Sequence, residues 1–166
     1  MLLIRLSLPA DRDEVWTILE PVLRAGETYS LPRDISREDA LAYWYRDGHE
    51  VFVAEDADRM LGTYFLQPNQ AGGGDHVANC GYMTSRDAQG RGVARAMLEH
   101  SLARAQARGF LAMQFNFVVS TNVRAVRTWH AYGFETVGRL PLAFRHPEQG
   151  LVDALVMYKR LDRATT

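Results

Sequence analysis

The stretch AQGRGVARAML (residues 88–98) places Gly90 and Gly92 directly before a run of residues with helical spacing. Small and apolar residues recur on one face of that run, and Gly109 ends it. This face comprises Ala94, Met97, Leu98, Ser101, Leu102 and Ala105. A glycine turn that leads into a helix leaves main-chain N–H groups unpaired, and the helix dipole favours negative charge at the same point. The stretch therefore predicts a site for a phosphate or diphosphate.

Three kinds of phosphate-binding loop have this general form, and their sequence requirements differ. A Walker-type loop ends in Gly-Lys-Ser/Thr, which the stretch lacks. A dinucleotide fingerprint needs a third glycine where Arg95 stands, and an acidic residue that the following strand FLAMQFNF does not supply. The third pattern, [QR]xxGx[GA], is met by Gln89, Gly92 and Ala94. A purely structural role, in which the glycines shape a strand-to-helix turn, remains the alternative.

Strand and helix patterns alternate on both sides of the glycine turn. The predicted strands are 2–8, two strands within 49–68 around the turn 55–58, then 76–84, 110–119, 134–140 and 151–161. The predicted helices begin near Asp11, near Ser36, after Gly92 and at 121, and Gly133 closes the last one. We expect Pro21 to end or kink the first helix. The three consecutive strands before the turn predict an antiparallel start of the sheet.

The bulk properties of the chain describe one domain, 1–166, with a core of its own. Nineteen basic and 20 acidic residues give a net charge of −1, so we expect no nucleic-acid partner and no membrane surface as a partner. Cys80 is the only cysteine, and charged residues interrupt the N-terminal apolar segment early. These features predict a cytoplasmic protein.

A second motif lies about 30 residues beyond the glycine turn. The stretch NVRAVRTWHAYGF (122–134) matches the pattern NxxAxxxYxxxGF at Asn122, Ala125, Gly133 and Phe134. With the glycine turn, it resembles the GCN5-related N-acetyltransferases over nearly the whole chain. The resemblance implies an α/β (α+β) fold with a mixed, mostly antiparallel sheet of about seven strands and helices on both faces. It also implies a V-shaped splay between the fourth and fifth strands, here 76–84 and 110–119.

The resemblance implies acetyl-CoA as co-substrate. The main chain near Met83 and Thr84 would bind the pantetheine amides and polarise the thioester carbonyl. The diphosphate would meet the N–H groups of Gln89, Gly90, Arg91, Gly92, Val93 and Ala94. Arg91 and Arg95 either reach the phosphates or form solvated surface. Asn122 contacts the pantetheine, caps its helix, or does both, and Trp129 stands beside the cofactor where many relatives have a tyrosine.

The residues expected to move protons differ from the family pattern. Strand 76–84 has no carboxylate, and Asn79 takes the position where many relatives have a glutamate base. Asparagine orients a substrate but accepts no proton, so the amine must arrive neutral or lose its proton through water. Trp129 is no practical proton donor at neutral pH. Tyr132, Tyr82 or water is left as the source of the proton for the leaving thiolate.

Asn79 and Asn116 are the predicted substrate-binding amides, because both lie near the crevice if the two splayed strands are neighbours. They either grip a carboxylate or amide of a small substrate or satisfy main-chain groups at the splay. With Asn122 they resemble the pattern of the azetidine-2-carboxylate N-acetyltransferases. The loop 25–34 would lie over the crevice and contribute Tyr29, and 143–150 would offer Arg145 and His146 from the other side.

Cys80 and the histidines are interpreted as structural. A lone cysteine on an apolar strand is usually a buried small side chain, and the histidines have no metal-ligand spacing, so we predict no metal. The leading hypothesis is direct acetyl transfer from acetyl-CoA to the amine of a small molecule, an amino acid or an analogue of one. The alternatives are a protein or peptide N-acetyltransferase and a non-catalytic acyl-CoA-binding regulatory module. A homodimer is the family-like expectation.

Overall fold

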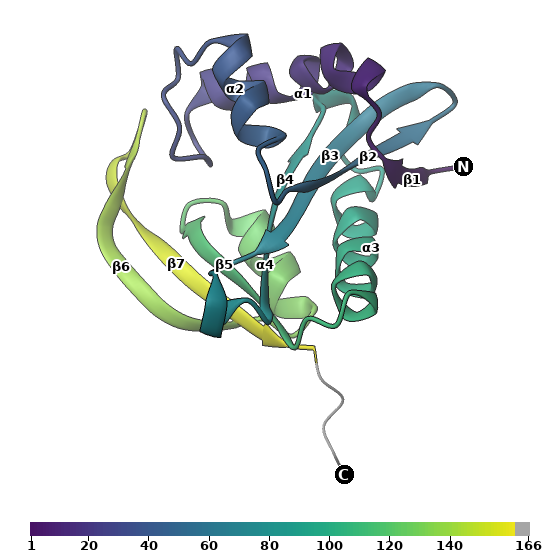
Figure 1. Ribbon diagram of the computed structural model, residues 1–166. Coiled ribbons are helices and arrows are strands. Elements are labelled where there is room, and N and C mark those ends of the chain that lie inside the picture. Colours follow the sequence, from purple (N-terminus) through teal and green to yellow (C-terminus); the bar gives the residue numbers. More distant parts are fainter. Residues whose placement is uncertain (162–166) are drawn as a thin grey trace.

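The structure is a computed structural model, and it describes residues 1–161. A seven-stranded sheet forms its centre, and the helices lie between its strands in the chain order (Figure 1). The strands are β1 (Leu3–Leu6), β2 (Glu50–Asp56), β3 (Arg59–Pro68), β4 (Val77–Thr84), β5 (Ala112–Val119), β6 (Glu135–His146) and β7 (Gly150–Arg160). The α-helices are α1 (Arg12–Ala25), α2 (Arg37–Trp44), α3 (Val93–Ala107) and α4 (Val123–Ala131). Short 3-10 turns lie at Pro9–Asp11, Gly72–Gly74 and Arg86–Ala88.

The sheet is antiparallel except at its centre. Its strand order is β1-β2-β3-β4-β5-β7-β6, and β4 and β5 form the parallel pair. Only two residue pairs join β4 to β5, Val77 with Ala112 and Ala78 with Met113, after which the two strands diverge. The predicted fold class and the splay between the fourth and fifth strands are thus confirmed.

Helices cover both faces of the sheet. On one face, α1 and α2 bury Val15, Ile18, Leu19 and Trp44 against β2, β3 and β4. On the other face, α3 and α4 contribute Met97, Leu98 and Trp129 to a second cluster. Burying each large apolar side chain stabilises the fold by roughly 1.5–3 kcal/mol. The splay is therefore held between two packed layers. No helix within residues 1–161 has the length and apolar character that a membrane crossing requires.

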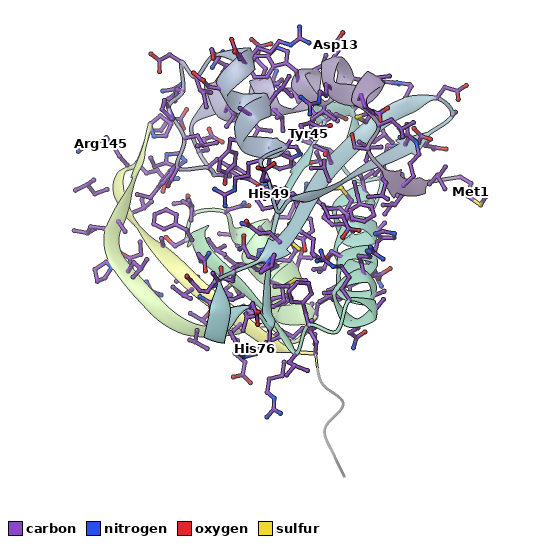
Figure 2. All side chains as sticks on the ribbon, in the orientation of Figure 1. Met1, Asp13, Tyr45, His49, His76 and Arg145 are labelled. Carbon is purple, nitrogen blue, oxygen red and sulfur yellow. The ribbon has the colours of Figure 1, made fainter. Side chains whose placement is uncertain are left out.

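Two element boundaries differ from the predicted ones. Helix α1 does not end at Pro21 but runs on to Ala25, where Gly26 in the left-handed region closes it. Pro21 has no N–H to donate to the carbonyl of Thr17, so the helix continues past it with one hydrogen bond fewer. Strand β6 runs on beyond residue 140 to His146, which places Arg145 in a strand rather than in a loop over the crevice. Figure 2 shows Arg145 near the far end of the β6–β7 hairpin.

The β6–β7 pair extends this far because its own turn is well bonded. The Nδ1 atom of His146 accepts the main-chain N–H groups of Glu148 and Gln149, each at 3.2 Å. The His146 side chain is buried, at 7% exposure. These contacts close the hairpin at Gly150, which has φ +74°. His146 therefore stabilises the turn between β6 and β7.

Candidate active site

The glycine turn has the conformation that its sequence predicts. Gly90 and Gly92 both have φ near +72°, a region that residues with a Cβ atom seldom occupy, and Gly92 is the N-cap of α3. Within the described residues, the N–H groups of Gly90, Gly92, Val93 and Ala94 meet no protein acceptor. They lie at the positive end of the 15-residue helix α3. The turn therefore presents a ready donor set for an anion.

A groove of about 760 Å³ runs beside this turn, between α1 and the end of β4. Its walls include Glu14, Thr17, Pro21, Glu27, Thr28, Arg59, Thr84, Ser85, Arg86, Asp87, Gln89 and Asn122. The Ser85 hydroxyl oxygen is buried and has no hydrogen-bond partner. Leaving such a group unpaired costs about 1–3 kcal/mol. The groove therefore holds an unused polar atom besides the donors of the turn.

The two arginines expected near the phosphates are engaged with carboxylates. Arg91 Nη2 donates to Asp56 at 2.8 Å, and Arg95 Nε donates to Glu99 at 3.0 Å. Both ion pairs are exposed, so solvent screens them and each is easily exchanged for another partner. Their role toward a phosphate stays a prediction. Gln89 lines the groove directly.

Strand alternation decides which main-chain groups of β4 face the splay. Ser85 N donates to Leu61 O and Val77 O accepts from Asn69 N, which sets the bonded pairs of the β3–β4 ladder. In that ladder the N–H and C=O of Met83 lie on the β3 side. The groups of its neighbours Tyr82 and Thr84 lie on the opposite side, toward β5, where no strand pairing reaches them.

The segment between α1 and α2 packs onto this part of β4. The Tyr29 hydroxyl donates to the Tyr82 carbonyl at 2.9 Å. Gly81 makes the approach possible, because a Cβ atom there would lie 2.5 Å from the Phe65 ring and 3.0 Å from the Tyr29 hydroxyl. Burial raises the pKa of Tyr29 well above its ordinary value. Tyr29 is therefore a neutral phenol, and its hydroxyl hydrogen is bonded to the Tyr82 carbonyl.

A second cavity, of about 320 Å³, lies in the splay itself. It shares Thr28 and Asn122 with the groove, so the two spaces meet there. Its lining residues include Tyr29, Ser30, Leu31, Tyr43, Phe65, Asn79, Cys80, Gly81, Tyr82, Phe115, Asn116, Phe117 and Trp129. None of the side chains that line it in the described chain is a carboxylate, an imidazole or a cation. The cavity therefore has aromatic walls and uncharged hydrogen-bonding groups.

The two predicted asparagines both line this cavity, and both already have partners. Asn79 is 9% exposed, and its Nδ2 donates to the Gln114 carbonyl at 3.0 Å while its Oδ1 accepts from Gln67 at 3.2 Å. Asn116 is exposed, with Oδ1 accepting from the Gln114 side chain and Nδ2 donating to Asn69. Asn79 thus bridges β4 to β5 where their main-chain pairing ends. The structural role accounts for these contacts and leaves one N–H of each amide available.

The residues considered as proton donors lie in three different places. Trp129 lines the splay cavity, with its ring centroid 5.3 Å from that of Tyr82. The Tyr82 hydroxyl is on the α3 side, 2.7 Å from Ser101, and burial raises its pKa well above the ordinary value. The Tyr132 hydroxyl donates to Glu99 on the surface, and Tyr132 lines neither cavity. The structure thus brings Trp129, but not the Tyr132 hydroxyl, to the splay.

The remaining candidates are resolved by burial and spacing. Burial raises the pKa of the Cys80 thiol to about 12, so the thiolate that a nucleophile requires is negligible at neutral pH. Among residues 1–161, no three His, Cys, Asp or Glu side chains come together as a metal site. Asn122 caps α4, with Oδ1 accepting from Ala125 N at 3.4 Å, and also borders both cavities. Both roles predicted for Asn122 are thus geometrically compatible.

Sequence reasoning missed several wall residues of the splay cavity. Tyr43 comes from α2 and Phe65 from β3, and both read as ordinary core positions in their own elements. Gln67, which holds the Asn79 amide, was also missed. No sequence signal marks these residues, because each reaches the cavity only after α2, β3 and β4 are packed together.

A family model described as the acetyltransferase (GNAT) family matches residues 13–134. An N-acetyltransferase named aca1 from Schizosaccharomyces pombe is 24% identical over 151 residues, which cover 81% of this chain and 72% of that protein. The matched region includes both cavities' main walls and the two sequence motifs.

Solved structures share the fold across the whole chain. A GCN5-related N-acetyltransferase from Kribbella flavida is 37% identical with a TM-score of 0.91, covering 96% of this chain and 97% of its own. The protein yncA of Salmonella typhimurium, solved with its cofactor acetyl-CoA, is 20% identical with a TM-score of 0.85, covering 100% of this chain and 97% of its own. The family match and the 37% identical structure agree with the glycine turn, the splay and the motif at 122–134. The chain belongs to the acetyltransferase (GNAT) family.

Proposed function

We propose that this acetyltransferase moves an acetyl group from acetyl-CoA directly to the amine of a small molecule, an amino acid or an analogue of one. One observation carries the proposal: an uncharged cavity of about 320 Å³ shares the wall residues Thr28 and Asn122 with the groove beside the anion-binding turn. A cavity of that size, walled by aromatic rings, suits a small acceptor. The junction would bring the acceptor and the acyl donor together at one point.

The residues of the groove fit acetyl-CoA. The free N–H groups of Gly90, Gly92, Val93 and Ala94 suit its diphosphate. The main-chain groups of Thr84, which face β5 and meet no strand there, suit an amide of an extended pantetheine arm, which would take the place of a missing strand. Bound acetyl-CoA supplies an activated acyl group. The similarity to yncA, solved with acetyl-CoA, supports this assignment.

The residues at the splay supply charge stabilisation and orientation. The Tyr82 N–H points toward β5, where it would stabilise the negative charge that develops on the acyl oxygen. Confinement of the amine next to the groove removes much of the entropic barrier to reaction. Because no carboxylate or imidazole lines the splay cavity in residues 1–161, the amine reacts as the free base and water carries its proton away. The catalytic assignments of Asn79, Met83 and Tyr132 stay predictions.

The test measures thiol release from acetyl-CoA with a panel of small amines and, in parallel, with peptides that carry a free N-terminus or a lysine. We expect turnover on small amines and little on peptides. Preferential acetylation of peptides would favour the protein N-acetyltransferase alternative. Tight acetyl-CoA binding without transfer, unchanged in Asn79→Ala, would favour the non-catalytic module. The homodimer and the cytoplasmic setting stay predictions from the sequence.

A further inference from the structure

A chain of hydrogen bonds connects the surface to the fork of the sheet. Arg46, which follows α2, donates from Nη2 to Gln67 Oε1 at 3.0 Å. Gln67 on β3 donates from Nε2 to Asn79 Oδ1 at 3.2 Å. Asn79 on β4 donates from Nδ2 to the Gln114 carbonyl on β5 at 3.0 Å. The three bonds therefore run in one direction, from the connection after α2 across β3 and β4 to β5.

The chemistry at the two ends fixes this direction. A guanidinium group only donates hydrogen bonds, and a carbonyl oxygen only accepts them. Gln67 must therefore present its oxygen to Arg46, which leaves its nitrogen for Asn79, and Asn79 must in turn present its nitrogen to Gln114. The amides of Asn116 and Asn69 form a shorter chain in which both partners can be reversed. Of the two asparagine amides predicted to bind substrate, Asn79 is the one held in a single orientation from both ends.

His49 holds the outer end of the chain in place. Arg46 Nε donates to His49 Nε2 at 2.8 Å, and His49 Nδ1 is 2.8 Å from the Trp44 carbonyl. The imidazole ring stacks on Phe65, a wall of the splay cavity, with centroids 4.0 Å apart. Figure 2 shows His49 below α2, on the side that faces the middle of the sheet. Arg46 is thus oriented although its side chain is exposed.

The fixed orientation of the Asn79 amide gives the splay cavity one end that donates hydrogen bonds and another end that accepts them. Because β4 lies between β3 and β5, Asn79 Oδ1 is held on the β3 side and Nδ2 on the β5 side, where the cavity lies. The second hydrogen of Nδ2 is what Asn79 offers to a ligand. At Tyr82, three residues and about 10 Å along the strand, the Tyr29 hydroxyl has given its hydrogen to the Tyr82 carbonyl. The lone pairs of the Tyr29 and Tyr82 oxygen atoms are therefore what this end of the cavity offers to a ligand.

We propose that Arg46 and Gln67 are positioning residues that make Asn79 a fixed hydrogen-bond donor, and that the acceptor substrate therefore carries a carbonyl or carboxylate oxygen in addition to its amine. The amine N–H groups would meet the oxygen atoms of Tyr29 and Tyr82, and the substrate oxygen would meet Asn79 Nδ2. This inference rests on the proposed function and deepens it. Carboxamides and carboxylates share the required oxygen, and the experiment below separates them.

Gln67→Glu tests the direction of the chain with a change of one atom. The carboxylate introduced there still accepts from Arg46, but it has no hydrogen to donate to Asn79 Oδ1. The Asn79 amide is then expected to turn, with Nδ2 toward the new carboxylate, so that its oxygen replaces its nitrogen on the cavity side. Gln106→Glu is the matched control, because Gln106 likewise donates to a main-chain carbonyl, that of Leu161, on α3 away from both cavities.

The probes are ω-amino carboxamides with graded chain lengths, the matching ω-amino carboxylates, and alkylamines of equal length. For the wild-type protein we expect kcat/KM to be at least about tenfold higher for the best oxygen-bearing probe than for its alkylamine. In Gln67→Glu this preference is expected to fall to about twofold or less, and in Gln106→Glu to persist. Whichever oxygen-bearing series is preferred identifies the charge of the substrate group.

A second variant and a second measurement test the same inference independently. Arg46→Met removes the fixed donor at an exposed position, so the variant is expected to fold. It should partially reduce the preference for oxygen-bearing probes. Calorimetric titration of the probes into the CoA-loaded protein measures the same preference without transfer. Equal use of alkylamines, or a preference unchanged in Gln67→Glu, overturns the inference while the proposed function stands. Tight acetyl-CoA binding with no turnover on any amine overturns both.

Discussion

At the scale of single residues, Gly92 combines an unusual backbone conformation with open space. Its φ is near +72°, and a Cβ atom built there would meet nothing within 4 Å. That space lies in front of the free N–H groups at the start of α3. The glycine is thus needed by the backbone and, in the proposed function, by the diphosphate that would fill the space.

Gly92→Ala is expected to separate these two needs when compared with Gly150→Ala. Gly150 has φ +74° and equally open surroundings, but it lies in the β6–β7 hairpin. Both variants should lose roughly 1–2 kcal/mol of unfolding free energy, because a residue with a Cβ atom is strained in this region. Only Gly92→Ala should weaken acetyl-CoA binding, by about tenfold or more in calorimetric titration. Equal affinities for the two variants would contradict the diphosphate assignment.

Tyr29→Phe tests the hydroxyl that reaches the Tyr82 carbonyl. The variant keeps the ring and removes one hydrogen bond, so it should lower the unfolding free energy by about 1 kcal/mol. It also removes the oxygen lone pairs at the amine end of the cavity, so kcat/KM for small amines should fall about tenfold.

Tyr45→Phe is the control for Tyr29→Phe, because it removes a hydroxyl that lies 2.7 Å from Ser7 Oγ and belongs to a residue that does not line the cavity. Figure 2 shows Tyr45 beside the end of α2. Its kcat/KM should match that of the wild type. A similar loss of activity in both variants would mean that Tyr29 acts only through stability.

At the scale of elements, Asn122 at the start of α4 has two roles. The side chain caps the helix, and it also stands where the groove meets the splay cavity. Asn122→Ser keeps a good capping residue, so the unfolding free energy should change by less than about 0.5 kcal/mol. Acetyl-CoA affinity should still fall, because the shorter side chain withdraws from the junction. Unchanged affinity would leave Asn122 with the cap alone.

The connection between α2 and β2 predicts a pH dependence through His49. Burial is the main cause that lowers the pKa of His49 below its ordinary value of 6.5, and the neighbouring Arg46 acts in the same direction. The unfolded chain therefore binds more protons than the folded one as pH falls below about 6.5. The stability that neutral His49 provides is fully present above that pH and is lost as pH falls through the lowered pKa.

His49→Gln should therefore flatten the acid side of the stability curve. Chemical denaturation at several pH values between about 7.5 and 5 should show a shallower fall for His49→Gln than for the wild type. The pKa of His100 is also lowered by burial, and its contribution is common to both proteins and cancels in the difference. Parallel curves would show that His49 carries no such linkage.

At the scale of the whole molecule, the groove and the cavity exist because two packed layers hold the sheet open. Acetyl-CoA that binds the folded state alone should stabilise it by about 2.7 kcal/mol at a concentration of 100 times its Kd. Tm should therefore rise by several degrees and continue to rise with concentration. NADH at the same concentration should leave Tm unchanged, because the turn lacks the dinucleotide fingerprint. An equal rise with NADH would contradict the choice of coenzyme A.

The sequence alone determined the parts of this protein that depend on local chemistry. The stretch AQGRGVARAML requires a left-handed glycine turn at a helix N-terminus, and Ser36 with Asp39 requires a helix cap, which the Ser36 hydroxyl and the Asp39 N–H form at 3.0 Å. Two motifs at a fixed separation were enough to predict the family, the sheet and the splay. Local rules did not locate the end of α1 at Ala25 or the end of β6 at His146, where β6 still pairs with β7.

Only the tertiary structure decided the orientation of the groups that meet at the splay. Whether Met83 or its neighbours face β5 depends on the register of β3 against β4, and a shift of one residue would reverse it. The direction of the Asn79 amide depends on Arg46 and Gln114, which are distant in sequence and share no local pattern with it. Which group donates a hydrogen bond and which accepts it depends on the contacts between elements in the folded protein. The sequence supplies the donors and acceptors, but it does not pair them.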